Sequence, residues 1–481
     1  MAPESREFAL SPQNEFRFEL DPGETLSLKL LTGRAELYGA ELPQERTYTF
    51  ASEYKGAVFT WHGCTLEMRH ASTEYVAEET PMVSYLNCHI ASEQMRVRSS
   101  IARRHGIGNQ TQAPRVLMLG AENSGKTTLC KILLNYALRA GQSWSPLIIN
   151  LDPLDGAWTV PGTLSASHFT SPVVVTSADN PFGTTATSAP GSLSFAGLLP
   201  LVFWFGHIDP KHNLDYMRRL ISALGAKVDQ HYQDYPEFSA SGIFIDTPAA
   251  FANPNQSPGQ SIEKYALIGA CVELFRVNTI IVMGNEKLTV EMQKRFADSR
   301  HGVSVVKVPR SGGVVDIDAA CRRRSVARQL RGYFYGARHA LRGEREEDSD
   351  FDPEATLAPT SSVVSFDGLH IYRIGEESLA PSSALPIGAP RAISTTQPIV
   401  VDPSSPMHQS RLLNGVLALL GPSALSVVQN DLSQLLECSV AGFLVITAID
   451  QDQRTMTVLA PSAASVEGRI AILGSIEWVE G

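Results

Sequence analysis

Alternation of apolar and polar side chains dominates the first hundred residues of the chain. Residues 25–30 and 46–50 alternate from one position to the next, which is the pattern of strands with one buried face. Turn signals such as Pro22-Gly23 separate the alternating segments. Short strands at this spacing predict a small β-sandwich or barrel. Residues 84–98 differ, because their pattern predicts a helix.

The middle of the chain contains short unbroken apolar runs instead. Such runs predict strands buried on both faces, and helical stretches lie between them. This alternation is typical of a parallel sheet with helices on both faces, which places the chain in the α/β class. The predicted strands are residues 115–119, 146–151, 200–204, 242–246, 279–283 and 304–308.

Two polar stretches divide the chain into three predicted domains. One ends near Pro114, and the other is the acidic run 344–350; both are typical of linkers. In the last block, residues 443–447 and 455–459 predict a strand pair. The Ser- and Thr-rich segment 171–194 predicts a long surface loop. The predicted domains are residues 1–100, 101–340 and 341–481.

Composition narrows the class of protein further. Of the 481 residues, 43 % are hydrophobic and 19 % are charged, which excludes a globally disordered chain. No uncharged apolar run is long enough to cross a membrane. The net charge of −10 argues against a protein that binds nucleic acid over its whole surface. It is compatible with a local basic binding site. The six cysteines are scattered without zinc-site spacing, which predicts reduced, buried thiols in an intracellular protein.

One motif carries specific chemistry. Residues 120–127 read GAENSGKT, which matches the phosphate-binding P-loop G-x-x-x-x-G-K-[ST]. The glycines let backbone amides point into one concavity, and the following helix aims its positive end at the same place. Lys126 is predicted to reach the β- and γ-phosphates, and Thr127 to offer its hydroxyl to Mg²⁺. The motif therefore predicts a bound nucleotide with Mg²⁺.

The residues that come after the other strands indicate the kind of P-loop protein. A GTPase needs D-x-x-G and N-K-x-D, but Asp246 is followed by Thr-Pro-Ala, and residues 284–287 read GNEK. A kinase-type site needs a carboxylate near the phosphates, for the water shell of the metal or for the proton of an acceptor hydroxyl. Asp152 and Asp246 each come directly after a predicted strand, at the sheet edge where such folds bind ligands. Either residue could instead cap a helix or lie in a loop.

Longer strings in the chain resemble a known family. The P-loop, the run 150–153 (NLDP) and the run 159–163 (TVPGT) look like the polynucleotide 5′-hydroxyl kinase family. Within that family, the chain resembles the catalytically degraded, fungal-like branch that includes a subunit of the pre-mRNA cleavage and polyadenylation machinery. The resemblance covers nearly the whole chain. Its other strings are residues 31–36, 38–42, 59–64, 85–87, 311–315, 331–336 and 440–443.

The resemblance implies an N-terminal β-sandwich, a central P-loop kinase-like domain and a small mixed C-terminal domain. It implies that Glu15 and Lys55 help to hold the base of ATP, and that Arg324, Arg328 and Arg331 form a basic lid. The P-loop positions that it assigns to ATP are Asn123, Ser124, Gly125, Lys126, Thr127 and Thr128, with the Thr127 hydroxyl on Mg²⁺.

Departures from the kinase-active pattern decide between two functions. Active members resemble D-x-G-Q after the second strand, whereas Asp155 stands here in place of the glutamine. Their T-x-G-W clasp ends here in Ala250, which cannot stack on a base, and Gln329 stands where a lid arginine is expected. We therefore expect an ATP-binding assembly subunit without kinase turnover. The alternative is an active RNA 5′-hydroxyl kinase in which Asp152 is the catalytic base.

The resemblance also implies a cellular setting. It places the protein in the nucleus, in a cleavage factor that is required for the endonucleolytic cut at pre-mRNA 3′ ends. The expected partners are the scaffold subunit that binds RNA polymerase II and other 3′-end processing subunits. RNA would be reached mainly through the complex, and no membrane is involved. A generic ATPase or GTPase motor is the remaining alternative.

Overall fold

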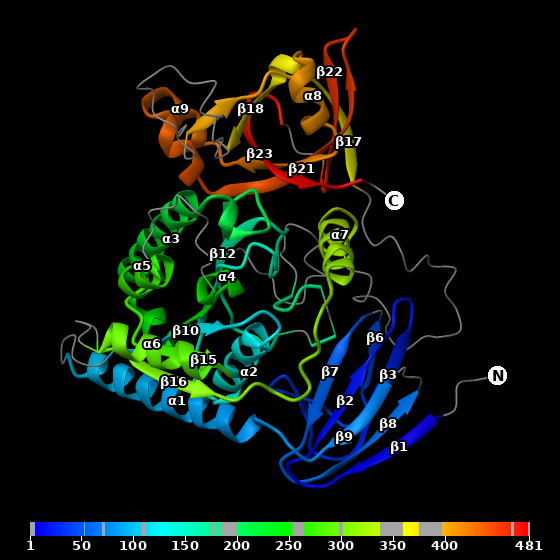
Figure 1. Cartoon of the computed structure of the whole chain (residues 1–481), viewed down its shortest axis with the longest axis vertical. Coiled ribbons are helices and arrows are strands. Elements are labelled where there is room, and N and C mark those ends of the chain that lie inside the picture. Colours follow the sequence, from blue (N-terminus) through cyan, green and yellow to red (C-terminus); the bar gives the residue numbers. More distant parts are fainter. Residues whose placement is uncertain are drawn as a thin grey trace.

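The structure is a computed structural model of the whole chain. It describes residues 5–51, 53–69, 73–106, 112–173, 175–176, 179–183, 200–253, 264–297, 302–336, 359–374, 397–462 and 466–479. The acidic run 344–350 lies outside these residues, and so does most of the loop predicted at 171–194. Figure 1 shows the N-terminal sandwich in blue, the central sheet with its helices, and the C-terminal sheet in orange and red.

The N-terminal part is a β-sandwich, as the sequence predicts. Its two sheets pack their apolar faces together, because alternate residues of each strand point inward; Phe16, Leu28 and Phe50 lie in this core. One sheet has the order β1 (Ser5–Leu10), β8 (Cys64–Arg69), β3 (Thr25–Gly33), β6 (Thr47–Ala51). The other has the order β5 (Ala40–Glu41), β4 (Glu36–Leu37), β7 (Lys55–Phe59), β2 (Glu15–Glu19), β9 (Thr73–Ala77).

The central sheet is mixed, and this differs in part from the parallel sheet that the sequence predicts. The strands β11, β14, β10, β15 and β16 pair in parallel, whereas β12 and β13 are antiparallel. The chain runs from β11 to β12 through a loop without a helix, and a parallel return needs a longer crossover. The order is β13 (Leu201–Trp204), β12 (Thr163–His168), β11 (Leu147–Asn150), β14 (Ile243–Asp246), β10 (Arg115–Gly120), β15 (Thr279–Met283), β16 (Ser304–Val308).

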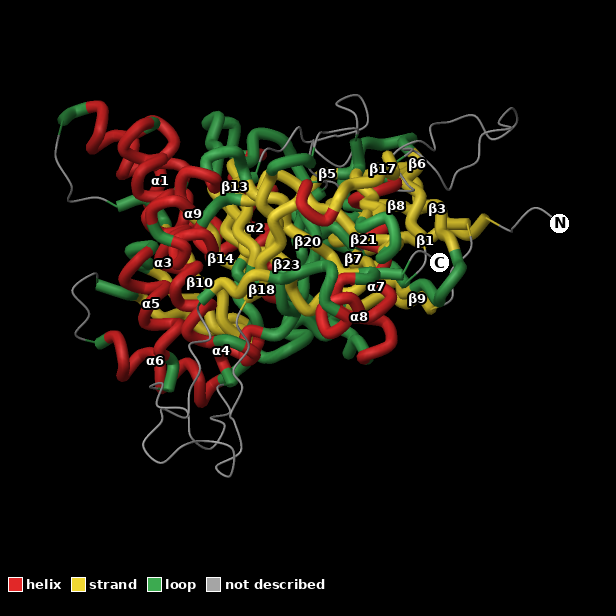
Figure 2. The backbone as a smooth tube through the Cα atoms, turned by 90° about the horizontal axis from the view of Figure 1, so that it is seen from above, coloured by secondary structure: helices red, strands yellow, loops and turns green. Residues whose placement is uncertain are grey.

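Helices cover both faces of this sheet, as predicted. Val116 and Met118 of β10 point to one face and pack in the cluster that holds α2, whereas Leu117 and Leu119 point to the other face, toward α3 and α5. Figure 2 shows helices α1, α3, α5 and α6 in red, gathered beside the yellow strands. The helices of this part are α1 (Met82–Arg104), α2 (Lys126–Arg139), α3 (Leu214–Asp234), α4 (Ala249–Ala252), α5 (Ala266–Leu274), α6 (Glu286–Phe296) and α7 (Ala319–Tyr335), with 3₁₀ turns η1 (Pro210–His212) and η2 (Pro236–Ser241).

The C-terminal part is a second mixed sheet. Its strands β18 and β23 pair in parallel and its other pairs are antiparallel, including the predicted pair β21 and β22. The order is β17 (Thr360–Ser365), β22 (Thr455–Ala460), β21 (Val440–Asp450), β20 (Gly415–Leu420), β23 (Arg469–Glu477), β18 (Leu369–Ile374), β19 (Pro398–Val400). The short helices are η3 (Phe366–Gly368), α8 (Pro406–Leu412), α9 (Ala424–Asn430) and η4 (Leu432–Glu437).

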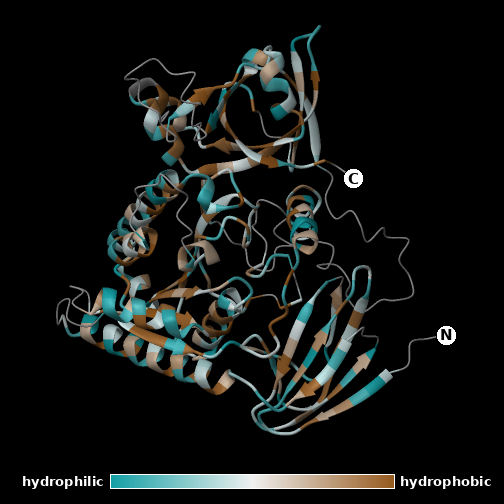
Figure 3. Ribbon diagram, viewed as in Figure 1, coloured by the Kyte–Doolittle hydropathy of each residue, from teal (hydrophilic) through white to brown (hydrophobic). Residues whose placement is uncertain are grey.

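One apolar core joins the central and C-terminal parts. Trp204 at the end of β13 packs on Phe443 of β21, with ring centroids 5.4 Å apart. The Tyr333 hydroxyl of α7 accepts a hydrogen bond from the backbone amide of Phe443 at 3.1 Å. Gly206 and Gly474 bring the two backbones together so closely that a Cβ on Gly474 would overlap Gly206. Figure 3 shows hydrophobic strands on both sides of this junction.

The cysteines and the helices of the structure bear on two expectations from composition. All six cysteines lie in the described part of the chain as free thiols. Cys64, Cys130 and Cys271 are buried, as expected, whereas the other three are partly exposed. Among the helices that the structure describes, none combines the length and the apolar character that a membrane crossing needs.

Candidate nucleotide-binding site

The P-loop lies between β10 and α2, where the sequence places it. Gly125 has φ 88° and Asn123 has φ 50°, so the loop turns through the left-handed region that glycine adopts without strain. Gly120 has no space for a side chain, because a Cβ there would meet Ser124 and Met283. No side chain caps the first turn of α2. Its first amide groups are therefore available to an anion.

The Lys126 side chain folds back onto the P-loop backbone. Its Nζ donates to the carbonyl oxygens of Ala121 at 2.9 Å and Gly120 at 3.4 Å, and the residue is buried. The Ser124 hydroxyl also donates to Ala121, at 2.8 Å. An ammonium held among carbonyls next to free amides is well placed to exchange these contacts for phosphate oxygens.

A carboxylate stands opposite the P-loop threonine. The Thr127 hydroxyl donates a hydrogen bond to Asp246 at the end of β14, and the amide of Thr247 donates to the same carboxylate at 3.0 Å. Burial raises the pKa of Asp246 to about 6, against the opposing effects of Lys126 and of the Thr127 hydrogen bond. The parallel pairing of β10, β11 and β14 brings Asp246 to the P-loop edge, as its place after a predicted strand indicates.

Two more carboxylates follow β11 on the same edge. Asp152 accepts from the amide of Leu154 at 3.1 Å, and Asp155 accepts from the amide of Ala157 at 3.1 Å. Burial raises the pKa of Asp152. Burial, followed by repulsion from Asp152 and Asp246, raises the pKa of Asp155 to about 7. Asp155, which stands where kinase-active members have glutamine, therefore adds a third acidic group to the site.

The donor set suits a magnesium ion that is bound chiefly through a nucleotide. Within the described residues, no group of three or more His, Cys, Asp or Glu side chains could hold a metal by itself. Mg²⁺ at a P-loop takes few protein ligands and keeps water and phosphate oxygens. The Thr127 hydroxyl would be one such ligand, and Asp246, to which it donates a hydrogen bond, would orient water on the ion. Burial, with a smaller contribution from Asp152, raises the pKa of Asp246, and a divalent cation beside this carboxylate would stabilise its ionised form.

Glu15 and Lys55, which are expected to hold the base of ATP, both lie on the sandwich but in different surroundings. Glu15 is buried and pairs with Arg17 at 2.8 Å, and Arg17 packs against Gly313. The same short segment brings Val314 against Gly125 of the P-loop, so Glu15 lies on the face of the sandwich that meets the site. Lys55 pairs with Glu19 at 2.6 Å. Their predicted contact with a base stays a prediction.

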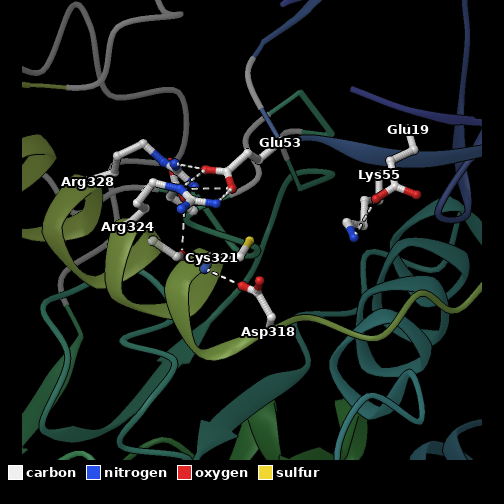
Figure 4. Close-up of polar contacts among 9 residues, drawn as sticks. Glu19, Glu53, Lys55, Asp318, Cys321, Arg324 and Arg328 are labelled. Atoms are coloured by element: carbon white, nitrogen blue, oxygen red, sulfur yellow. Dashed lines mark hydrogen bonds and ion pairs between the residues drawn. The ribbon is translucent and has the colours of Figure 1, made fainter. Parts of the chain in front are cut away.

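Two of the three predicted lid arginines, Arg324 and Arg328, are held by ion pairs. The carboxylate of Glu53 accepts hydrogen bonds from both Arg324 and Arg328 (Figure 4). Arg328 also pairs with Asp179 at 2.8 Å. Arg331 lies over the ring of Tyr335, 5.5 Å from its centroid. In the structure, Arg324 and Arg328 thus tie α7 to the sandwich.

A different arginine of α7 reaches the P-loop. Arg322 donates to the Asn123 side chain at 2.8 Å and pairs with Glu122 at 2.8 Å. Gln329, which directly follows Arg328 on α7, contacts the loop after β11, since the Gly156 amide donates to its side-chain oxygen at 3.4 Å. Sequence reasoning missed Glu53 and the role of Arg322, because neither belongs to a motif. Only the arginine run 322–324 signalled that contacts lie here.

Family models account for most of the chain. The N-terminal β-sandwich domain of polyadenylation factor matches residues 9–99, the P-loop of the mRNA cleavage and polyadenylation factor CLP1 matches residues 120–336, and the pre-mRNA cleavage complex II protein Clp1 matches residues 357–480. The mRNA cleavage and polyadenylation factor CLP1 of Laccaria bicolor is 49 % identical, over 99 % of this chain and 98 % of its own. The chain belongs to the Clp1 family. The resemblance that the sequence suggests is therefore confirmed.

Other Clp1 proteins show how wide the family is. A Danio rerio relative named polyribonucleotide 5′-hydroxyl-kinase Clp1 is 31 % identical, over 98 % of this chain and 94 % of its own. A solved complex of wild-type Clp1p with a segment of Pcf11p matches with a TM-score of 0.79 and 23 % identity, over 100 % of both chains. A second structure, of the extended Pcf11p–Clp1p interface and of ATP loss in a point mutant, has the same TM-score and identity, over 99 % of this chain and 100 % of that one. At this identity the structures show the shared Clp1 fold.

Proposed function

We propose that the protein is an ATP-binding assembly subunit of the nuclear pre-mRNA 3′-end cleavage and polyadenylation machinery, which holds MgATP without kinase turnover. One observation carries this proposal: helix α7 contacts the P-loop through Arg322 and the sandwich through Arg324. A nucleotide on the P-loop would therefore bind where three elements meet. Such a ligand stabilises the arrangement of domains, and the stabilisation grows with the logarithm of the ratio of its free concentration to its Kd.

The surroundings of the phosphates support holding over transfer. A kinase stabilises the charge of the moving phosphoryl group with cations that are free to contact it. Here Arg324 and Arg328 pair with Glu53, and Gln329 occupies the next position. Asp155 adds a carboxylate next to Asp152. Negative charge near the γ-phosphate opposes the binding of an RNA that would accept the phosphoryl group.

The names of the relatives support the cellular role. The Laccaria bicolor protein is named a cleavage and polyadenylation factor, and the solved Clp1p structures contain Pcf11p. We propose that this chain likewise binds a Pcf11-type scaffold subunit, which in turn contacts RNA polymerase II and other 3′-end processing subunits. The net charge of −10 favours protein partners over independent binding to RNA.

The alternative function, an RNA 5′-hydroxyl kinase, is supported by two specific observations. The Danio rerio relative is named a polyribonucleotide 5′-hydroxyl kinase, and this chain retains Lys126 and Asp152 at the P-loop edge. In that function, Asp152 would accept the proton of an RNA 5′-hydroxyl while Lys126 neutralises the transferring phosphoryl group.

Two measurements on purified protein test these functions. We expect stoichiometric ATP to stay with the chain through purification, to be lost in Lys126→Ala, and to remain in the control Lys287→Ala on the exposed surface of α6. We expect no transfer of label from γ-labelled ATP to a 5′-hydroxyl RNA oligonucleotide. Transfer that requires both Lys126 and Asp152 would establish the kinase function instead. A wild-type chain without nucleotide would contradict the ATP-holding role.

A further inference from the structure

Helix α1 exposes a regular stripe of aliphatic side chains. Val83, Ile90, Val97 and Ile101 are 46 %, 45 %, 39 % and 49 % exposed. Asn87 and Gln94 are exposed between them, and Glu93 and Arg96 turn to other partners. The stripe thus advances by alternating steps of four and three residues from 83 to 101. Isolated exposed aliphatics are ordinary, whereas aliphatic side chains that recur along one face of a helix, here with two polar residues between them, indicate an interaction surface.

The opposite face of α1 packs against the central part, so the exposed stripe is not the face that this helix contributes to the core. Tyr85 donates to the carbonyl of Pro309 at 3.1 Å, and the buried Arg96 donates to the carbonyl of Ser241 at 2.8 Å. The Arg96 guanidinium also lies over the Phe244 ring, 5.4 Å from its centroid. Figure 1 shows α1 along the outer edge of the central part. The stripe is therefore presented on a rigid helix.

The spacing fits a second helix as occupant. Alternating steps of three and four residues form the seam along which two helices pack with a small crossing angle. Polar residues within such a seam, here Asn87 and Gln94, reduce affinity but fix the register of the partner. A helix of 23 residues offers such a seam over about 34 Å.

The charge beside the stripe defines the chemistry of the partner. Arg98, Arg103 and Arg104 are exposed at the end of α1. In the part of the chain that the structure describes, none of these guanidinium groups forms an ion pair or a hydrogen bond. Unpaired charge at the rim of an apolar surface steers a partner of opposite sign and sets its orientation.

A second copy of the chain fits the stripe less well than another subunit does. One helix face of about 34 Å by 10 Å covers roughly 340 Å², and a stable dimer needs about 800 Å² from each partner. A subunit that wraps over several surfaces can add the missing area elsewhere. We propose that α1 docks an acidic amphipathic helix of another subunit of the 3′-end machinery. The kind of partner rests on the proposed function, whereas the docking surface does not.

Photo-crosslinking in the native complex tests the proposal. The full chain carries a photo-reactive amino acid at position 90, or at the control position Met407, which is 83 % exposed on α8. The complex is purified, irradiated and analysed by mass spectrometry. We expect position 90 to link to a segment of another subunit that has apolar residues at helical spacing and an excess of Asp and Glu. Replacing Arg98, Arg103 and Arg104 with Glu should lower this yield about tenfold.

Contrary outcomes are equally defined. A link to a second copy of the chain, to a basic segment or to RNA overturns the proposal, and so does a yield no higher than at position 407. Ile90→Glu should lose the linked subunit about tenfold relative to Met407→Glu. Both sites are exposed, so both variants should keep the melting temperature of the wild type. If Lys126→Ala loses ATP but retains the position-90 link, the docking surface and the ATP-holding role are separate.

Discussion

Glu53 and Arg324 join the N-terminal sandwich to helix α7 through a two-point contact. The Nη2 atom of Arg324 lies 2.5 Å from Oε1 of Glu53, and its Nε lies 3.1 Å from the same oxygen. Arg328 binds the other carboxylate oxygen. Because Arg322 at the start of α7 contacts the P-loop, this one helix couples the position of the sandwich to the nucleotide site.

Glu53→Gln should loosen α7. Glutamine keeps the shape of the side chain but removes the charge that holds two arginines. Arg324 then loses its carboxylate partner, and Arg328 keeps only Asp179. We expect faster amide hydrogen exchange across residues 319–335 and a melting temperature lower by a few degrees. The control is Glu45→Gln, because Glu45 pairs with Lys29 at an exposed site. Equal exchange in both variants would show that Glu53 does not hold the helix.

The same contact predicts a loss of stability in acid. Hydrogen bonds from Arg324 and Arg328 lower the pKa of Glu53 from 4.5 to about 2, against the opposing effect of burial. A carboxylate with a lowered folded-state pKa stabilises the fold above its unfolded pKa and loses that contribution as pH falls. The difference in melting temperature between wild type and Glu53→Gln should therefore be full at pH 6 and shrink from about pH 4.5 toward pH 2. A difference that does not change with pH would exclude the ion pair as its source.

Local patterns in the sequence predict the elements and the P-loop, but not the contacts that join them. The run 115–119 and the motif directly after it indicate β10 and the phosphate loop, because period and glycine spacing are local properties. Glu53 is 271 residues from Arg324, and nothing near either residue marks the pair. Strand β12 was also missed: its residues 163–168 (TLSASH) are largely polar and small, although the sheet buries them. The C-terminal pair β21 and β22 was predictable because both strands are apolar and join by a short turn.

Gly474→Ala should separate the C-terminal sheet from the central part. A Cβ at this position would overlap the backbone carbonyl of Gly206, which cannot move as a side chain can. We expect a loss of about 1–3 kcal/mol in the free energy of unfolding, as for other overpacked sites. Denaturant unfolding measures this loss. Gly421→Ala is the matched control, because its nearest neighbours leave room for a methyl group. Equal stability of the two variants would mean that the junction can relax.

Asp155 predicts a pH effect of the opposite sign to that of Glu53. Burial, Asp152 and Asp246 raise its pKa from 3.8 to about 7. An acid whose folded-state pKa is raised destabilises the fold increasingly as pH rises from its unfolded value to its folded value. The neighbouring Lys131 gives little relief above pH 8, because burial lowers its own pKa to about 8. The cost of ionised Asp155 should therefore be small at pH 4 and full above about pH 8.

Asp155→Asn should remove this cost. In protein stripped of nucleotide and divalent metal, we expect the variant to exceed wild type by on the order of 1–2 kcal/mol at pH 8, once partial solvent exposure is allowed for. The difference should be small near pH 4 and should vanish below about pH 3, where the wild-type carboxyl is protonated in both states. Asp452→Asn, in an exposed turn, should change neither value. A variant that is less stable than wild type at pH 8 would mean that the Asp155 carboxylate is needed where it stands, with its hydrogen bond from the Ala157 amide outweighing its repulsion by Asp152 and Asp246.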